Sequence, residues 1–153
     1  ISKTMRLSAA FTLVDYFNML RSRNTYEACN SIEVTGGDLG HIEMTFKTEA
    51  GRHANFRGQL HGAVLLGFSD TLMGTSCFTL SKSVVTLELK GNFVQSMKAG
   101  EVVRGVANVE HNGNRTMVCT CRCYNSLGEL TYMATGTFFV LDKYELPQLP
   151  WRL

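Results

Sequence analysis

The fold is decided by the stretch Asn55-Phe-Arg-Gly-Gln-Leu-His-Gly-Ala-Val-Leu-Leu-Gly-Phe-Ser-Asp-Thr-Leu-Met-Gly74. From Gly62 to about Leu80 the residues are apolar almost throughout, and Asp70 is the only charged one. A helix that is hydrophobic on every side is a buried helix. We therefore expect a long helix over residues 62–80 at the centre of the domain.

The segments on both sides of this helix have the composition of strands. Residues 28–37 and 40–48 read as two strands joined by a turn at residues 36–40, and residues 49–60 read as a polar loop. After the helix, turn residues recur at 96–100, 111–114 and 125–128, with segments rich in Val, Thr, Phe and Tyr between them. This pattern predicts an α+β fold in which an antiparallel sheet wraps a long central helix.

The length of 153 residues suits one domain spanning residues 1–153. We expect an N-terminal amphipathic helix within residues 1–24, because apolar residues recur there at helical spacing, namely Leu7, Ala10, Phe11, Val14 and Phe17. A helix fits better than a signal peptide, since Asp15 and Asn18 interrupt the apolar run. Ile1 indicates that the natural start is missing. Residues 142–153 are expected to be a loosely held tail.

Charge and hydropathy exclude several classes of partner. The net charge of +2 gives no basic patch of the kind that binds nucleic acid. No stretch reaches the ~20 apolar residues of a membrane span, so we expect no membrane partner.

The cysteines point to a reducing compartment. Three of the five, Cys119, Cys121 and Cys123, alternate along a predicted strand and so share one face. Strand neighbours at i and i+2 lie ~6.6 Å apart, whereas thiolates sharing a zinc ion lie ~3.8 Å apart. We therefore expect buried free thiols, no metal site and a cytoplasmic protein.

Asp70 and Gly62 are the candidate reactive positions. A carboxylate on an apolar helix has to be paired, solvated by a cleft or shifted in pKa, and a purely structural pairing is the alternative to catalysis. The Gly62 N–H, at the positive end of the helix, can hold the oxyanion that forms during acyl transfer. His61 can act as a base, anchor the loop or orient the helix start, and the pattern favours a structural role.

Spacing then predicts an oligomer. Gly62 and Asp70 are eight residues apart, ~12 Å along a helix, whereas a base or nucleophile has to approach the reacting carbon within ~3 Å. Two antiparallel copies of the helix would bring Gly62 of one subunit to Asp70 of the other. We expect at least a homodimer.

The order Asn55, Gly58, His61-Gly62, Asp70 resembles that of the hotdog-fold thioesterases of the phenylacetate-degradation (PaaI-type) group. The resemblance covers about residues 28–141 and continues through four further segments, namely Thr86–Phe93, Lys98–Glu101, Gly113–Thr116 and Gly136–Phe139. It implies a hotdog fold and hydrolysis of an acyl-CoA thioester.

The resemblance also implies roles for single residues. Asp70 activates water or attacks the thioester directly, and Thr86 helps to orient the water. The Gly62 N–H and Asn55 polarise the thioester carbonyl, and His61 adjoins them as a further catalytic candidate. Substrate contacts are implied for Ala63, Arg115 and Thr116. Ala63 departs from the usual His-Gly-Gly, and Arg115 and Thr116 match a turn that contacts CoA.

No cofactor is implied, since coenzyme A is part of the substrate. The expected assembly is a dimer or a dimer of dimers. Two other functions stay open: an acyl-thioester hydratase or dehydratase of the same fold, and an acyl-CoA-binding module without catalysis. Neither the acyl group nor the choice between a CoA and a carrier-protein thioester is fixed by any residue.

Overall fold

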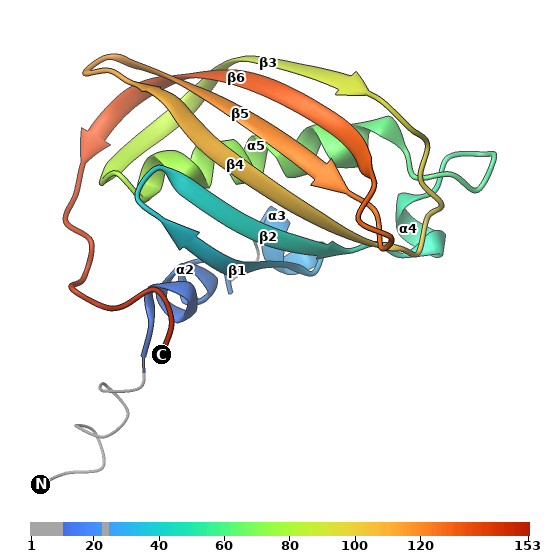
Figure 1. The fold of residues 1–153 in the computed structure, drawn as a ribbon, viewed down its shortest axis with the longest axis horizontal. Coiled ribbons are helices and arrows are strands. Elements are labelled where there is room, and N and C mark those ends of the chain that lie inside the picture. Colours follow the sequence, from blue (N-terminus) through green and yellow to red (C-terminus); the bar gives the residue numbers. More distant parts are fainter. Residues whose placement is uncertain (1–10, 23–24) are drawn as a thin grey trace, which may run out of the picture.

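The computed structural model describes residues 11–22 and 25–153. Its helices are α2 (Leu13–Leu20), α3 (Tyr26–Cys29), α4 (Ala50–His53) and α5 (Gly62–Phe78). Its strands are β1 (Ile32–Asp38), β2 (His41–Lys47), β3 (Lys82–Phe93), β4 (Val102–Asn112), β5 (Thr116–Tyr124) and β6 (Leu130–Lys143). They form one antiparallel sheet in the order β1-β2-β4-β5-β6-β3 (Figure 1).

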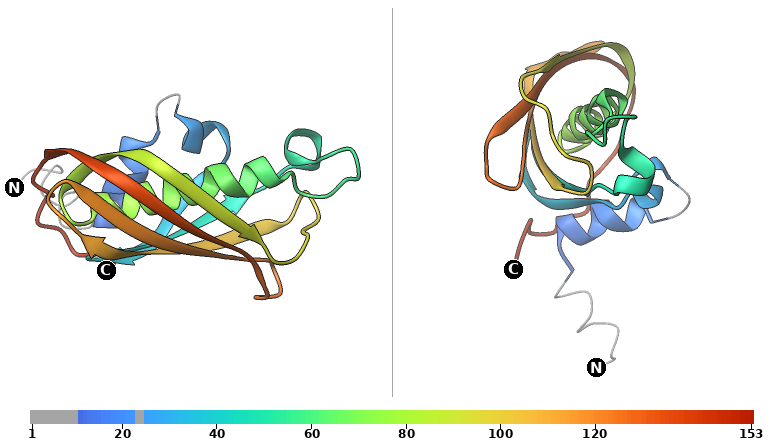
Figure 2. Two further views of the ribbon diagram at one scale, coloured as in Figure 1. Left: turned by 90° about the horizontal axis from the view of Figure 1, so that it is seen from above. Right: turned by 90° about the vertical axis from the view of Figure 1, so that its right-hand side faces the viewer.

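The sheet curls around α5, which runs along its concave side (Figure 2). Phe68 and Leu72 of α5 are fully buried, and the Phe68 ring meets the Phe46 ring of β2 edge to face at 5.4 Å. Each buried side chain of this size stabilises the fold by about 1.5–3 kcal/mol relative to exposure. The architecture confirms the expected α+β hotdog fold with a long central helix.

One side of α5 differs from expectation, because the sheet does not enclose the helix completely. Ala63 is exposed, and Gly67 and Asp70 are half-buried on the side that the strands leave uncovered. A single curved sheet covers only part of a helix, so the described strands leave one face of this apolar helix open. The helix ends at Phe78 rather than Leu80.

Within the described residues, helix α2 begins at Leu13. Thr12 caps α2: its hydroxyl accepts from the Asp15 N–H at 3.2 Å, and the Asp15 carboxylate accepts from the Thr12 N–H at 3.0 Å. Because a capping residue stands outside the helix, Phe11 precedes α2 instead of lying on its apolar face. The rest of the predicted helix, residues 1–10 and 23–24, lies outside the described residues.

The prediction of a loosely held C-terminal tail is wrong. Trp151 stacks on Phe17 of α2, with ring centroids 5.6 Å apart and planes within 5°. The Leu13 N–H donates to the Pro150 carbonyl at 2.8 Å. The tail therefore packs onto α2 and stabilises its position against β1. The last strand also runs on to Lys143, into the predicted tail.

Two local elements were not predicted. The short helix α3 stands where the first strand was expected to start, and α4 forms within the predicted loop 49–60. The cysteine prediction is confirmed in its geometry: Cys119, Cys121 and Cys123 are buried free thiols on one face of β5. Among the described helices, none combines the length and the hydropathy that a membrane crossing requires.

Candidate active site

Asp70 lies on the uncovered side of α5 and is bonded to the neighbouring strand. The Thr86 hydroxyl, on β3, donates to Asp70 Oδ1 at 2.6 Å. No described lysine, arginine or histidine forms an ion pair with this carboxylate. Asp70 is therefore held by a single hydroxyl and remains half-exposed, an arrangement open to a substrate or a water molecule.

The start of α5 is capped by His61. Its Nδ1 accepts from the Ala63 N–H at 3.0 Å, so Nδ1 carries no proton in this arrangement. The Val64 N–H donates to the His61 carbonyl at 3.0 Å. Between them, the Gly62 N–H has no acceptor among the described groups, and it points from the positive end of the helix dipole. Capping thus leaves one backbone donor available for a ligand.

Asn55 is oriented by the loop that precedes α5. Its Oδ1 accepts from the N–H groups of Arg57 at 2.9 Å and Gln59 at 3.1 Å. The loop is closed by further backbone bonds from Asn55 to Gln59 and from Gly58 to Asn55. Because both loop bonds use the amide oxygen, the Asn55 NH₂ group is left as a donor, with no described acceptor.

A cavity of about 320 Å³, lined by both polar and apolar residues, adjoins Asn55 and the start of α5. Asn55, Leu65, Phe93 and Met97 are among its lining residues, and Asp70 is not. A Cβ added to Gly62 would lie 3.2 Å from the Phe93 ring, so glycine is what lets this ring approach the helix start. Phe93 was missed by the sequence analysis because its proximity to Gly62 arises from packing between distant segments.

His53 is a second residue that the sequence did not single out. Its Nδ1 accepts from the Glu49 N–H at 2.9 Å, its Nε2 lies 2.8 Å from Asn30 Oδ1, and its carbonyl accepts from the His61 N–H. Burial lowers the pKa of His53, as does the charge of Arg52, although Glu49 opposes them. A neutral His53 therefore fixes the loop that carries Asn55 to the start of α5.

Arg115 and Thr116 lie at the other end of the molecule. The turn before Arg115 is bound by Lys82, whose Nζ donates to the Gly113 carbonyl at 2.9 Å, and Lys82 follows the C-terminal end of α5. Since α5 has 17 residues, this end is ~25 Å from Gly62. Within one chain, the expected CoA contacts are thus separated from the start of α5.

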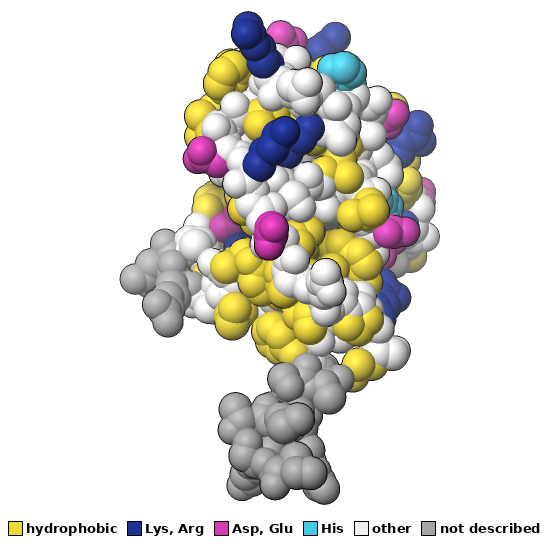
Figure 3. All heavy atoms as spheres, turned by 90° about the vertical axis from the view of Figure 1, so that its left-hand side faces the viewer, with side chains coloured by type: hydrophobic (Ala, Val, Ile, Leu, Met, Phe, Trp, Pro, Cys, Tyr) yellow, Lys and Arg dark blue, Asp and Glu magenta, His cyan; other side chains and the backbone are white. Residues whose placement is uncertain are grey.

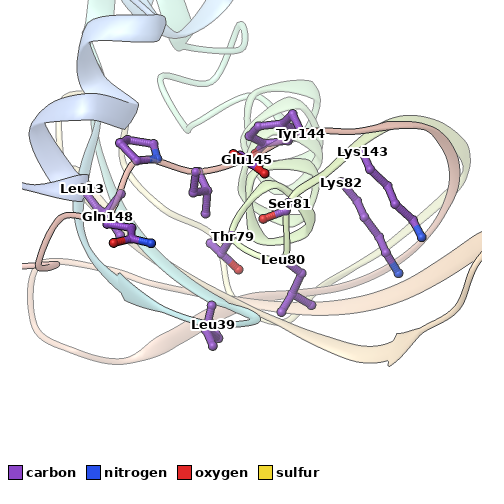
Figure 4. Close-up of a pocket in the computed structure, with 12 residues that line it drawn as sticks. Leu13, Leu39, Thr79, Leu80, Ser81, Lys82, Lys143, Tyr144, Glu145 and Gln148 are labelled. Carbon is purple, nitrogen blue, oxygen red and sulfur yellow. The ribbon is translucent and has the colours of Figure 1, made fainter.

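A groove of about 1050 Å³ is also at this end, between residues 79–82 and 143–148 (Figure 4). Lys82 and Lys143 extend side by side along it (Figure 4). Hydrophobic side chains gather on the lower half of the same end, below several basic ones (Figure 3). Asp70 lies eight residues before the end of α5 and does not line this groove, so we do not assign the groove to the candidate site.

The predicted residues therefore form three groups. Asp70 and Thr86 are in direct contact. Asn55, His61, Gly62 and Ala63 cluster at the start of α5, ~12 Å away along the helix axis. The third group is Arg115 with Thr116, at the opposite end of the chain's only long described helix.

The match to known families covers all but one of these positions. The family model of the thioesterase superfamily matches residues 57–132, a segment that includes the helix start, Asp70 and Thr86. The chain matches the thioesterase superfamily over this segment, which is about half of its length. This match confirms the prediction of a thioesterase enzyme. A search of curated protein sequences gave no match.

Solved structures agree on the fold of this thioesterase. The E. coli PaaI protein of the phenylacetic acid degradation operon is similar over 83% of this chain and 91% of its own, with 19% identity and a TM-score of 0.77. A Haemophilus influenzae thioesterase is similar over 90% and 96%, with 22% identity and a TM-score of 0.78. A hypothetical thioesterase of Streptococcus pneumoniae, solved with coenzyme A, is similar over 74% and 88%, with 26% identity and a TM-score of 0.71.

Proposed function

We propose that this thioesterase hydrolyses an acyl-CoA thioester to the free acid and CoA at a site shared by two subunits. Asp70 of one subunit is the general base or the nucleophile. The Gly62 N–H and the Asn55 NH₂ of the other subunit polarise the thioester carbonyl. The observation that carries the proposal is the pairing of an accessible Asp70–Thr86 bond with unused donors at the start of the same helix.

The edge of the sheet supports a shared site. β3 is an edge strand of 12 residues, and a long unpaired edge is a ready template for another strand. Leu87, at a bulge of β3, is 58% exposed, and Phe93 near its end is 57% exposed. A second copy that pairs along β3 would cover these side chains and the open side of α5. Two-fold symmetry would then set the two helices antiparallel.

In this arrangement the carbonyl oxygen binds the Gly62 N–H and the Asn55 amide, and Asp70 of the partner subunit faces the carbonyl carbon. As a base, Asp70 removes a proton from water while the water oxygen attacks that carbon, and Thr86 orients the carboxylate. As a nucleophile, Asp70 attacks directly and forms an anhydride that water hydrolyses. In both routes the oxyanion is held by the two donors until the C–S bond breaks and CoA leaves. CoA is the leaving group, and the proposed reaction uses no cofactor.

The comparisons support this assignment of Asp70 and Thr86. The structures similar to this chain include two variants of the S. pneumoniae thioesterase, one with an aspartate and one with a threonine replaced by alanine. Those two positions are sixteen residues apart in that protein, the same separation as Asp70 and Thr86 here. The same protein was solved with coenzyme A, which supports a CoA ester as the substrate.

A hydratase or dehydratase is less well supported. Such enzymes pair a histidine with a carboxylate, whereas His61 uses Nδ1 to cap α5 and precedes Asp70 by nine residues. Ala63, the departure that motivated a non-catalytic binding module, is exposed beside the uncovered face of α5. Its methyl group therefore does not block the start of the helix within this chain.

The test is release of free thiol from a panel of aryl-, short- and medium-chain acyl-CoAs by the parent protein and Asp70→Asn. We expect kcat to fall at least about 100-fold in the variant, the lower range for removal of a general base. Asp142→Asn, at an exposed aspartate of β6, is the matched control and should keep the parent rate. Equal turnover by the parent and Asp70→Asn would disprove the role given to Asp70. CoA-ester binding without turnover would favour the binding module.

A further inference from the structure

Tyr26 reaches from α3 to the middle of α5 and is not part of the site described so far. A Cβ added to Gly67 would lie 2.5 Å from the Tyr26 hydroxyl and 3.2 Å from Cζ. The tip of the ring therefore rests on the backbone of α5 at a position where any larger residue would displace it. Figure 2 shows α3 alongside this part of α5.

The position of α3 is fixed by contacts on both sides. The Thr25 hydroxyl caps α3 by accepting from the Ala28 N–H at 3.2 Å. Arg21 of the preceding segment donates to Thr75 Oγ1 of α5 at 2.6 Å and lies 3.7 Å from the Glu27 carboxylate. These contacts fix the position of α3, and α3 in turn holds the Tyr26 side chain against α5.

Gly67 and Asp70 are neighbours on the same side of α5. Residues at i and i+3 of a helix have Cβ positions ~5–6 Å apart, so the Tyr26 hydroxyl, which lies over Gly67, is on the same side of α5 as the Asp70 carboxylate. Burial is the main cause that raises the pKa of Tyr26, and the charges of Glu27 and then Asp70 raise it further. The phenol therefore stays protonated and can donate a hydrogen bond. The residue is 46% exposed, so part of its side chain remains open to solvent.

We propose that Tyr26 is a specificity-determining residue of the thioesterase, and that its ring forms the wall against which the acyl group packs when the thioester lies at Asp70. This inference rests on the proposed function, because it requires an acyl group at Asp70. The ring lies over Gly67, about one helical turn from the carboxylate that would meet the carbonyl carbon. An acyl chain leaving that carbon along α5 meets the Tyr26 ring over Gly67.

The test compares kcat/KM for acetyl-CoA, hexanoyl-CoA and an aryl-acetyl-CoA in the parent, Tyr26→Phe and Tyr26→Ala. Removing the ring should raise kcat/KM for the bulkiest substrate relative to acetyl-CoA by about tenfold or more, since one extra methylene in a pocket already changes selectivity by 10- to 200-fold. Tyr26→Phe keeps the wall and should keep the parent's order of preference. Tyr124→Phe, whose ring packs under Arg104, is the matched control and should leave the order unchanged.

A second variant keeps the test independent of folding. Gly67→Ala pushes the ring away from α5 and should shift selectivity in the same direction as Tyr26→Ala. The double variant should match Tyr26→Ala alone, because the added methyl then has room. A selectivity ratio unchanged in Tyr26→Ala, or all substrates slowed equally in an otherwise active enzyme, would overturn the inference and leave the proposed function intact. A parent that hydrolyses none of the esters would overturn both.

Discussion

A heterodimer of two inactive variants tests most directly whether the site is shared between subunits. One chain carries Asp70→Asn. The other carries Asn55→Asp, which keeps the oxygen that accepts from Arg57 and Gln59 but removes the NH₂ donor. Each homodimer then lacks one catalytic group at both sites. The heterodimer has one site with both defects and one site with none.

The expected activity follows from the geometry of α5. The start of the helix and Asp70 are ~12 Å apart, so the two groups that act on one thioester come from different chains. The purified heterodimer should show about half the parent rate per dimer, since one of its two symmetric sites is intact. Each homodimer should be at least about 100-fold slower than the parent.

Two affinity tags on co-produced chains allow the heterodimer to be purified and assayed by thiol release. A heterodimer of the parent chain with Asn55→Asp is the control, and it should also retain about half the rate, as one of its two sites is unaltered. If the heterodimer of the two variants is as slow as the homodimers, while the control shows half activity, both groups act within one chain and the shared-site argument is refuted.

Two further predictions concern the groups around the site. Thr86→Val removes the 2.6 Å hydrogen bond to Asp70 and should lower kcat/KM about tenfold. This factor corresponds to about 1.5 kcal/mol for a hydrogen bond to a charged group. Thr86→Ser keeps the hydroxyl, so its kcat/KM should stay within about threefold of the parent value. His53 has a lowered pKa in the fold, so the unfolded chain binds more protons and stability falls as the pH drops below the unfolded value near 6.5. The urea midpoint should therefore fall between pH 7.5 and 5.5, and by less in His53→Gln than in the partly exposed control His41→Gln. An equal fall in both would contradict this role for His53.

Periodicity in the sequence was sufficient to predict the elements that carry the fold. The apolar run from Gly62 identified the central helix, and the three turn signals after it identified the meander of β4, β5 and β6. These signals are local, because each depends on side-chain spacing within one segment. The packed C-terminal tail and the short helices α3 and α4 depend on contacts with distant residues, which spacing does not record. The start of α2 is set by the Thr12–Asp15 capping box rather than by apolar spacing.

The candidate site shows the same division. Asp70 and Gly62 could be predicted as site residues from the sequence alone. A single acid on an apolar helix and a glycine at the start of a helix each have a chemical property that does not depend on distant contacts. The Asp70–Thr86 bond came only through the family resemblance, since nothing local links residues sixteen positions apart on a helix and a strand. Phe93 and Tyr26 were missed because each contacts a glycine of α5 that is distant in the sequence. A glycine has no side chain whose size or chemistry would predict which residue packs against it.

The open side of α5 and the open edge of β3 are best explained together. Thr86 links them directly, because it belongs to the edge strand and bonds to the only charged residue of the helix. An interface that extends the sheet along β3 would therefore also bring the two copies of α5 together beside Asp70. Dimer assembly and formation of the active site would then be one event. Charged substitutions at Leu87, which is exposed on that edge, should abolish activity in parallel with dimerisation although they alter no reacting group.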